Sequence, residues 1–214
     1  MISLSDLKKY LEPRLRQELP GSKAHQEVAP YRNVDFTKEI ILKATLSSVL
    51  ILFYEKDHAI YTTLIQRSTY NGNHSGQISF PGGKMEKTDA SLMITALRET
   101  QEEIGLSPDE ITIIGQLSDV FIPVSNFCVT PIIGCVSFVP SFVPDKREVK
   151  KIIELKVTDL LLNENLQSRT IQLSDNNKIK APCFVFDETI VWGATALILN
   201  ELRYLLNEFE ASND

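Results

Sequence analysis

The chain has 214 residues, 43% hydrophobic and 23% charged, and these proportions exclude a disordered or fibrous protein. Its formal net charge of -6 disfavours non-specific binding to long nucleic acid, which depends on clustered lysine and arginine. No stretch is apolar enough for a membrane span, and acidic residues near the N-terminus argue against a targeting peptide. We therefore expect a single cytoplasmic domain over residues 1–214, with no membrane and no long nucleic acid as partner.

The N-terminal third of the chain predicts a helix followed by a β-hairpin. Leucines at helical spacing indicate an amphipathic helix that the Pro20-Gly21 pair ends, within a helical extension over residues 1–40. Two apolar stretches, 44–54 and 60–67, flank a polar turn and predict paired strands. Residues 69–75 contain Asn-Gly-Asn and predict a loop.

The rest of the chain predicts a glutamate-rich helix, a series of strands and a C-terminal helix. A short apolar segment, 77–80, precedes Pro-Gly-Gly, and Thr88 or Asp89 is expected to cap a helix that Gly105 ends. The remaining strands and the last helix are predicted at 111–117, 126–139, 148–155, 183–186 and 194–209. This order predicts an α+β fold with a mixed sheet between helices.

The three cysteines, Cys128, Cys135 and Cys183, are an odd number in apolar surroundings. Their spacing is not that of a metal site. We expect reduced core residues and not a disulfide framework or a nucleophile.

The glutamate-rich helix is expected to separate a core face from an acidic face. A helix advances about 100° per residue, so its apolar residues gather on one side. The residues predicted for that core face are Met93, Ala96, Leu97, Thr100 and Ile104. The glutamates predicted for roughly the opposite side are Glu99, Glu102 and Glu103. Such carboxylates repel one another unless a cation lies between them, and their hard oxygens suit Mg²⁺ or Mn²⁺.

Two neighbouring features favour a metal site over the alternative of a solvated acidic face. Gly82 and Gly83 precede the helix, and glycine backbone can approach a ligand closely. Arg98 lies one turn before Glu102 and can hold that carboxylate by an ion pair.

The segment from Gly83 through Arg98-Glu99-Thr100-Gln101-Glu102-Glu103-Ile104-Gly105-Leu106 resembles the Nudix box, the loop-helix-loop signature of the Nudix hydrolase superfamily. The core pattern Arg-Glu-x-x-Glu-Glu-x-Gly is intact over this box, residues 83–106. Two upstream positions, usually Gly and Glu, are Lys84 and Ala90 here, and Glu86 or Asp89 is expected in the upstream acidic role. The resemblance implies a Nudix-like α/β/α sandwich.

The displaced glycine pair is similar to the subfamily that hydrolyses coenzyme A. That subfamily has a second signature before the box, which Arg67-Ser68 and the segment 76–83 match, although Gly72 stands where the subfamily has an arginine. The candidate substrate contacts on this signature are Arg67, Ser68, His74, Gly76 and Gly82. For His74, a solvent-facing side chain is the alternative.

The resemblance implies hydrolysis of a pyrophosphate bond, with Mg²⁺ or Mn²⁺ held by Glu99, Glu102 and Glu103 and with the Gly83 carbonyl as a further ligand. The metal would activate a water, and Glu102, Glu103 or Glu148 would accept its proton. Coenzyme A or its acyl derivatives would give 3',5'-ADP and (acyl-)4'-phosphopantetheine.

Two alternatives to coenzyme A hydrolysis stay open. One is a different nucleoside diphosphate derivative, such as ADP-ribose or a dinucleotide, and the other is a nucleotide-binding module without hydrolysis. In each case the partner is a small nucleotide, and the oligomeric state stays open, with a homodimer among the alternatives.

Overall fold

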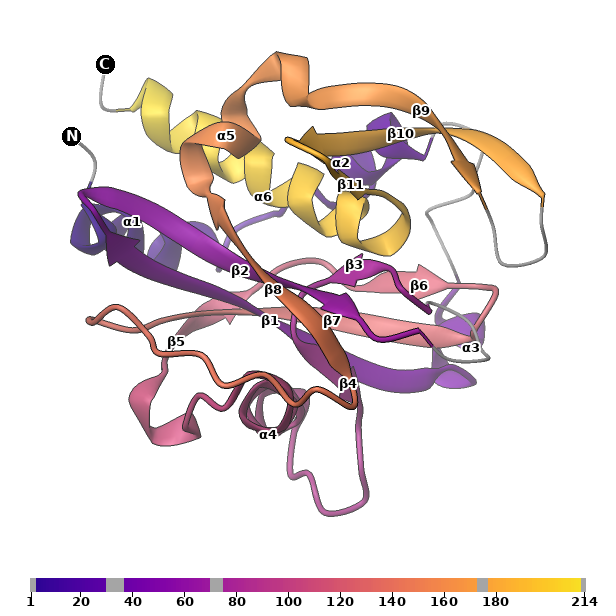
Figure 1. The fold of residues 1–214 in the computed structure, drawn as a ribbon, viewed down its shortest axis with the longest axis horizontal. Helices are drawn as coiled ribbons and strands as arrows, with labels where there is room; N and C mark the ends of the chain where they lie inside the picture. The colour runs from indigo at the N-terminus through magenta and orange to yellow at the C-terminus, as the bar shows by residue number, and fades with distance from the viewer. Residues whose placement is uncertain (1–2, 30–36, 70–74, 173–176, 213–214) are drawn as a thin grey trace.

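A mixed β-sheet forms the centre of the molecule in the computed structural model, which describes residues 3–29, 37–69, 75–172 and 177–212 (Figure 1). Its strands are β1 (Thr45–Lys56), β2 (Ala59–Arg67), β3 (Ile78–Ser79), β4 (Gly82–Lys84), β5 (Thr112–Gln116), β6 (Val120–Ile122), β7 (Phe127–Cys135) and β8 (Val149–Lys156). The main path runs β3-β2-β1-β7-β5, and β4, β6 and β8 pair with β1, β7 and β2, respectively. β1 and β7 are parallel and the other pairs are antiparallel, which confirms the predicted mixed sheet.

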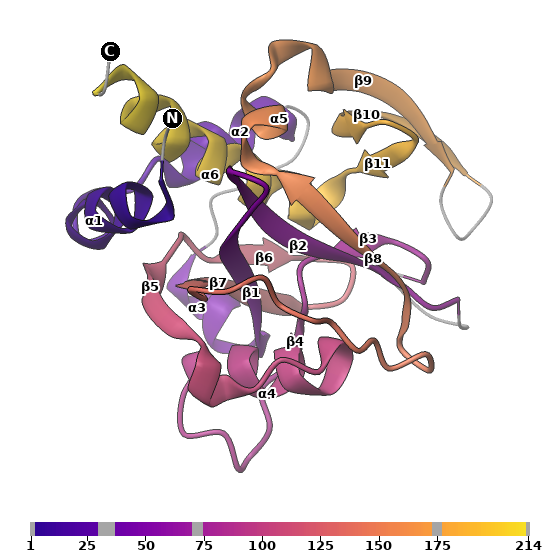
Figure 2. The ribbon, with the colours of Figure 1, turned by 60° about the vertical axis from the view of Figure 1, so that its left-hand side comes forward.

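Helices cover both faces of this sheet. α4 (Leu92–Ile104) lies on one face, and α6 (Gly193–Ala211) lies on the other (Figures 1 and 2). The face of α6 also carries α1 (Leu4–Arg14), α2 (Gly21–Val28), α5 (Val157–Leu161) and a three-stranded sheet of β9 (Leu166–Gln172), β10 (Lys178–Phe186) and β11 (Thr189–Val191). A short helix, α3 (Lys38–Leu42), precedes β1. Within the described ranges, no helix is long and apolar enough to cross a membrane.

The central strand β1 explains why the sheet sits between two layers. Its residues 50–54 are all apolar or aromatic, and each is 0% exposed. Ile51 and Phe53 belong to the core beneath α6, whereas Leu50 and Leu52 belong to the core beneath α4. An uninterrupted apolar strand is typical of a sheet that is buried on both faces. The α/β/α layering expected from the sequence is therefore present.

The Pro20-Gly21 pair begins a helix, so the prediction that it ends one is wrong. α1 ends at Arg14, and α2 begins at Gly21 with Pro20 as its N-terminal flanking residue. Proline suits the start of a helix because the first amide groups have no partner within the helix. Leu7 and Leu11 of α1 are buried in the same core as α6.

The predicted cap of α4 is also wrong, although its end is confirmed. Ser91 is the N-cap, and its hydroxyl accepts a hydrogen bond from the Ile94 amide at 3.3 Å. Asp89 is unavailable as a cap because its carboxylate binds Arg98 and Thr95. Gly105 ends the helix in the left-handed conformation, with φ of 76°.

The three cysteines are free and buried, as the sequence predicts. Burial raises the pKa of each thiol, and that of Cys128 reaches about 11. A thiol that stays protonated is a poor nucleophile, so these side chains act in packing.

Candidate active site

The two glycines of the Pro-Gly-Gly turn let β4 lie close to the backbone of β1 and to the side chain of Glu99 on α4. Gly82 has φ of 152°, and a Cβ there would lie 2.2 Å from the Ser48 carbonyl oxygen on β1. At Gly83 a Cβ would lie 2.5 Å from the carboxyl carbon of Glu99. Backbone therefore requires glycine at Gly82, whereas a side chain at Gly83 would displace the carboxylate of Glu99.

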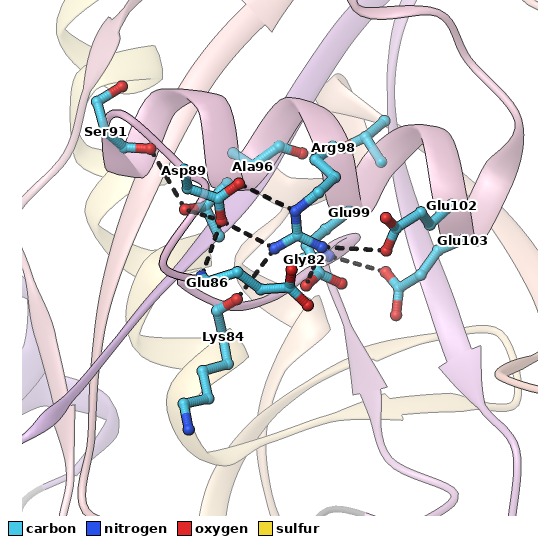
Figure 3. A network of polar contacts seen from close by, with 12 residues as sticks. Gly82, Lys84, Glu86, Asp89, Ser91, Ala96, Arg98, Glu99, Glu102 and Glu103 are labelled. Carbon is cyan, nitrogen blue, oxygen red and sulfur yellow. Dashed lines mark hydrogen bonds and ion pairs between the residues drawn. The ribbon is translucent and has the colours of Figure 1, made fainter.

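Arg98 stands at the centre of a polar network between the turn and α4 (Figure 3). Its Nε and Nη2 donate to the two carboxylate oxygens of Asp89, at 3.1 and 2.9 Å. Its Nη1 donates to Glu99 at 2.9 Å and to Glu102 at 3.1 Å, so the expected pair with Glu102 is present. Nη2 also donates to the Lys84 carbonyl oxygen at 3.1 Å. One guanidinium thus fixes two glutamates of α4 relative to the turn.

Asp89, and not Glu86, is the upstream acidic partner of Arg98. The backbone amide of Glu86 donates to Asp89 at 2.9 Å, and the Thr95 hydroxyl donates at 3.0 Å. These bonds, with the stronger one from Arg98, hold the pKa of the buried Asp89 carboxyl well below its usual range. Asp89 is therefore a fixed anion that orients the arginine.

The three glutamates of α4 do not share one solvent-facing side, which corrects the expected separation of faces. The side chain of Glu102 is 58% exposed and that of Glu99 is 15% exposed, whereas Glu103 is 1% exposed. Seven residues make almost two full turns, so Glu103 follows Ala96 on the core side. Met93, expected in the core, is 42% exposed in the first turn.

Glu103 is a buried carboxylate with two donors. Its Oε1 accepts from Arg67 Nη1 at 3.1 Å, and its Oε2 accepts from the Gly82 amide at 2.8 Å. Burial raises the pKa of Glu103 to about 7, against the lowering effect of Arg67 and Gly82, and the charges of Glu99 and Glu148 raise it further. Burial likewise raises the pKa of Glu99, although Arg98 opposes this.

The donor chemistry of these side chains fits a hard divalent cation. In the described part of the chain, no three His, Cys, Asp or Glu side chains converge closely enough to hold a metal ion. Glu99 and Glu102 each use one oxygen on Arg98 Nη1, and within the described residues the other oxygen accepts no hydrogen bond. A carboxylate offers about four lone-pair positions, so Glu103 also keeps acceptor capacity beyond its two bonds. Carboxylate oxygens of this kind are the ligands of Mg²⁺ and Mn²⁺.

The upstream signature reaches the acidic helix through Arg67. The next residue, Ser68, donates its amide to the Glu148 carbonyl at 2.7 Å, and the Gly76 amide donates to the Ser68 carbonyl at 3.4 Å. Glu148 is exposed, and its charge acts on Glu99 and Glu103. The remaining positions of interest, His74 and Gly72, lie outside the described residues.

The α/β/α sandwich, with an arginine-bound acidic helix behind a glycine turn, has the arrangement that the resemblance to a Nudix hydrolase implies. Residues 44–166, more than half of the chain, match the NUDIX domain family. The chain therefore belongs to the Nudix hydrolase family, whose members act on nucleoside diphosphate derivatives.

Bacterial relatives and solved structures agree with this assignment. The chain is 31% identical over 145 residues to "Uncharacterized Nudix hydrolase NudL" of Pectobacterium atrosepticum, which covers 68% of this chain and 74% of that protein. It is 34% identical to the protein of the same name from Citrobacter koseri, over 65% of this chain and 71% of that one.

Two solved structures share the fold at low sequence identity. A Nudix hydrolase of M. smegmatis, RenU, has a TM-score of 0.51 and 16% identity, over 79% of this chain and 87% of that one. A MutT/nudix family protein of Enterococcus faecalis has a TM-score of 0.50 and 16% identity, over 97% and 76%. At 16% sequence identity, these two structures support the fold and nothing further.

Proposed function

We propose that this protein hydrolyses the pyrophosphate bond of coenzyme A or its acyl derivatives, giving 3',5'-ADP and (acyl-)4'-phosphopantetheine. The observation that carries pyrophosphate hydrolysis is the Arg98 network, in which one guanidinium holds Glu99 and Glu102 beside the glycine turn. The choice of coenzyme A is supported by the upstream signature, which Arg67-Ser68 and the segment 76–83 match.

In this proposal Glu99, Glu102 and Glu103 would hold Mg²⁺ or Mn²⁺, with the Gly83 carbonyl as a further ligand, and the bound cation would supply charge neutralisation for the pyrophosphate and a lowered pKa for a water. The chain's own contribution is positioning. Asp89 fixes Arg98, and Arg98 fixes Glu99 and Glu102. Arg67 and the Gly82 amide fix Glu103.

Three carboxylates are candidates for the base that accepts the proton of the attacking water. Glu102 and Glu148 are open to solvent and can reach a water directly. Glu103 is buried and already bound by two donors, but its pKa of about 7 is close to that of an efficient base at neutral pH. Single Glu→Gln variants at the three positions, compared by kcat against pH, separate these roles.

The direct test is a substrate panel with product identification by mass. The panel contains coenzyme A, acetyl-coenzyme A, ADP-ribose and a diadenosine polyphosphate, each with Mg²⁺ or Mn²⁺. Release of 3',5'-ADP from coenzyme A, at the highest kcat/KM of the panel, is the expected result. A preference for ADP-ribose or the dinucleotide would overturn the substrate, and hydrolysis of no compound would favour a binding module.

The assignment of the acidic helix is tested by Glu102→Gln, with Glu188→Gln as the matched control. Glu102 is an exposed side chain, so its replacement should leave folding unchanged while kcat falls about 100-fold or more. Glu188 is exposed on the three-stranded sheet's side of the molecule and should tolerate the same change. Full metal-dependent activity in Glu102→Gln would contradict the proposed roles.

A second candidate substrate is another nucleoside diphosphate derivative. It is favoured by Gly72, because glycine cannot form the phosphate contact that an arginine would provide at that position. Introducing the charge with Gly72→Arg separates the two candidates. If coenzyme A is the substrate, its KM should fall relative to that of ADP-ribose.

A further inference from the structure

A cavity of about 420 Å³ lies between the residues that follow β2 and the segment that leads into β8. One wall comes from the end of β2, with Ser68 and Thr69. The other wall comes from the segment that leads into β8, with Lys146, Arg147 and Lys150. We call it the basic cavity, because three of its lining residues are cationic and none is a carboxylate.

The basic cavity has free positive charge in a chain whose net charge is -6. Arg147 is largely neutralised, because its guanidinium donates to both carboxylate oxygens of Asp145, at distances from 2.6 to 3.1 Å. In the part of the chain that the structure describes, Lys146 and Lys150 form no ion pair, and both are exposed. A lysine ammonium is a compact charge that binds phosphate well, and the Thr69 hydroxyl can add a hydrogen bond. The Ser68 hydroxyl already donates to the Lys146 carbonyl oxygen at 3.5 Å.

Both walls of the basic cavity are connected to Glu103 of the acidic helix through short stretches of chain. Ser68 and Thr69 directly follow Arg67, whose guanidinium binds Glu103. On the other wall, the Asp145 amide donates to the Glu103 carbonyl at 3.0 Å. Consecutive Cα atoms are only about 3.8 Å apart, so both walls begin within a few residues of Glu103.

The charged residues at the start of β8 differ in what they face: some line the basic cavity, and one acts on the acidic helix α4. Lys146, Arg147 and Lys150 line the basic cavity, whereas Glu148 does not. Instead, the charge of Glu148 acts on Glu99 and Glu103. The cations of this segment thus line the basic cavity, and its one glutamate does not.

From this juxtaposition we propose that the basic cavity binds a phosphate monoester that the substrate nucleotide carries in addition to its pyrophosphate. Lys146 and Lys150 would be specificity-determining residues for a nucleoside diphosphate derivative with a phosphorylated ribose. This inference rests on the proposed function, since it concerns the substrate of the same site. It adds residues outside both the Nudix box and the upstream signature.

The test is equilibrium binding, which needs no turnover. Calorimetry at constant ionic strength gives the Kd of 3',5'-ADP, 5'-AMP and inorganic phosphate for the full chain. The wild type should bind 3',5'-ADP about tenfold or more tightly than 5'-AMP, since charge-assisted bonds to the second phosphate are added. In the double variant Lys146→Gln/Lys150→Gln this ratio should fall to near one. The double variant Lys178→Gln/Lys180→Gln removes two exposed charges from β10 and should keep the wild-type ratio.

Three outcomes would overturn the basic cavity as a nucleotide subsite. They are equal binding of the two nucleotides by the wild type, an unchanged ratio in Lys146→Gln/Lys150→Gln, and displacement of 3',5'-ADP by inorganic phosphate at equal affinity. Hydrolysis of coenzyme A and of dephospho-coenzyme A is measured separately. A lysine-dependent preference without cleavage of coenzyme A supports the cavity and contradicts the proposed function, and cleavage without the preference does the reverse.

Discussion

Two buried glutamates, Glu201 on α6 and Glu103 on α4, show how the same residue type serves different ends. They are 0% and 1% exposed, respectively. Glu201 accepts from the Gly21 amide at 3.1 Å and from the amide and hydroxyl of Ser118 at 3.3 and 2.6 Å, and its second oxygen lies 3.0 Å from His25 Nε2. Glu103 has only Arg67 and the Gly82 amide.

The net pKa shifts of the two carboxyl groups have opposite directions, although burial raises the pKa of both. Burial raises the pKa of Glu201, but the bonds from His25 and Ser118 outweigh it and the net pKa is lowered. For Glu103 burial outweighs its partners, and the pKa rises to about 7. A fully bonded carboxylate joins α2, β5–β6 and α6, whereas an incompletely compensated one sits where a cation can act. From this contrast we expect Glu201 to contribute mainly to stability and Glu103 mainly to the proposed activity.

The largest expected effect on stability is that of Glu201→Ala. The change leaves the Gly21 and Ser118 donors and the His25 ring without their acceptor, and it opens a cavity. We expect the free energy of unfolding, measured in urea, to fall by about 3–5 kcal/mol. Glu210→Ala on the same helix, where the side chain is only partly buried, should change it by less than about 0.5 kcal/mol. Equal losses in the two variants would remove the structural role of Glu201.

The reverse pattern is expected for Glu103→Gln. The amide oxygen can still accept from Gly82, and Arg67, whose side chain is 24% exposed, can turn to solvent. The loss in unfolding free energy should therefore be smaller, about 1–2 kcal/mol. In contrast, kcat in the presence of Mg²⁺ should fall about 100-fold or more. If Glu103→Gln lost as much stability as Glu201→Ala and kept its kcat, the proposed difference in role between Glu103 and Glu201 would be wrong.

The sequence predicts those strands well that have a local hydrophobic pattern, and it predicts poorly those that depend on pairing with a distant strand. The apolar runs of β1 and β2 and the stop at Gly105 are local signals, and each prediction is confirmed. The three-residue strand β4 has no such signal, since Gly-Gly-Lys is a poor strand former and depends on pairing with β1.

The sequence predicts which residues form the acidic site, but it does not predict that Glu103 is buried. The pair of Arg98 with Glu102 follows from helical spacing and is present. The burial of Glu103 follows from the same spacing once it is counted from Ala96, so this signal was available in the sequence. The contact of Glu201 with His25 joins residues 176 positions apart, and no local sequence pattern predicts it. The Pro20-Gly21 pair is compatible with both a helix stop and a helix start, and only packing of α2 on α6 decides.

The smallest expected effect is the pH dependence of the Glu201 contribution. Because its pKa in the folded protein is lowered below the ordinary 4.5, the folded state binds its proton less readily than the unfolded chain does. The contribution is therefore complete above the unfolded-state pKa and is lost as pH falls through the folded-state pKa. Glu201→Gln removes the titration, so the difference in unfolding free energy between wild type and this variant should shrink as the pH falls below about 4.5. The other carboxylates titrate in both proteins and cancel in this difference. Metal-free buffer keeps the acidic helix from contributing a cation-dependent change, and Glu210→Gln should run parallel to wild type throughout. A difference that grows as the solution is acidified would show that Glu201 is held protonated in the fold, and the contrast with Glu103 would then fail.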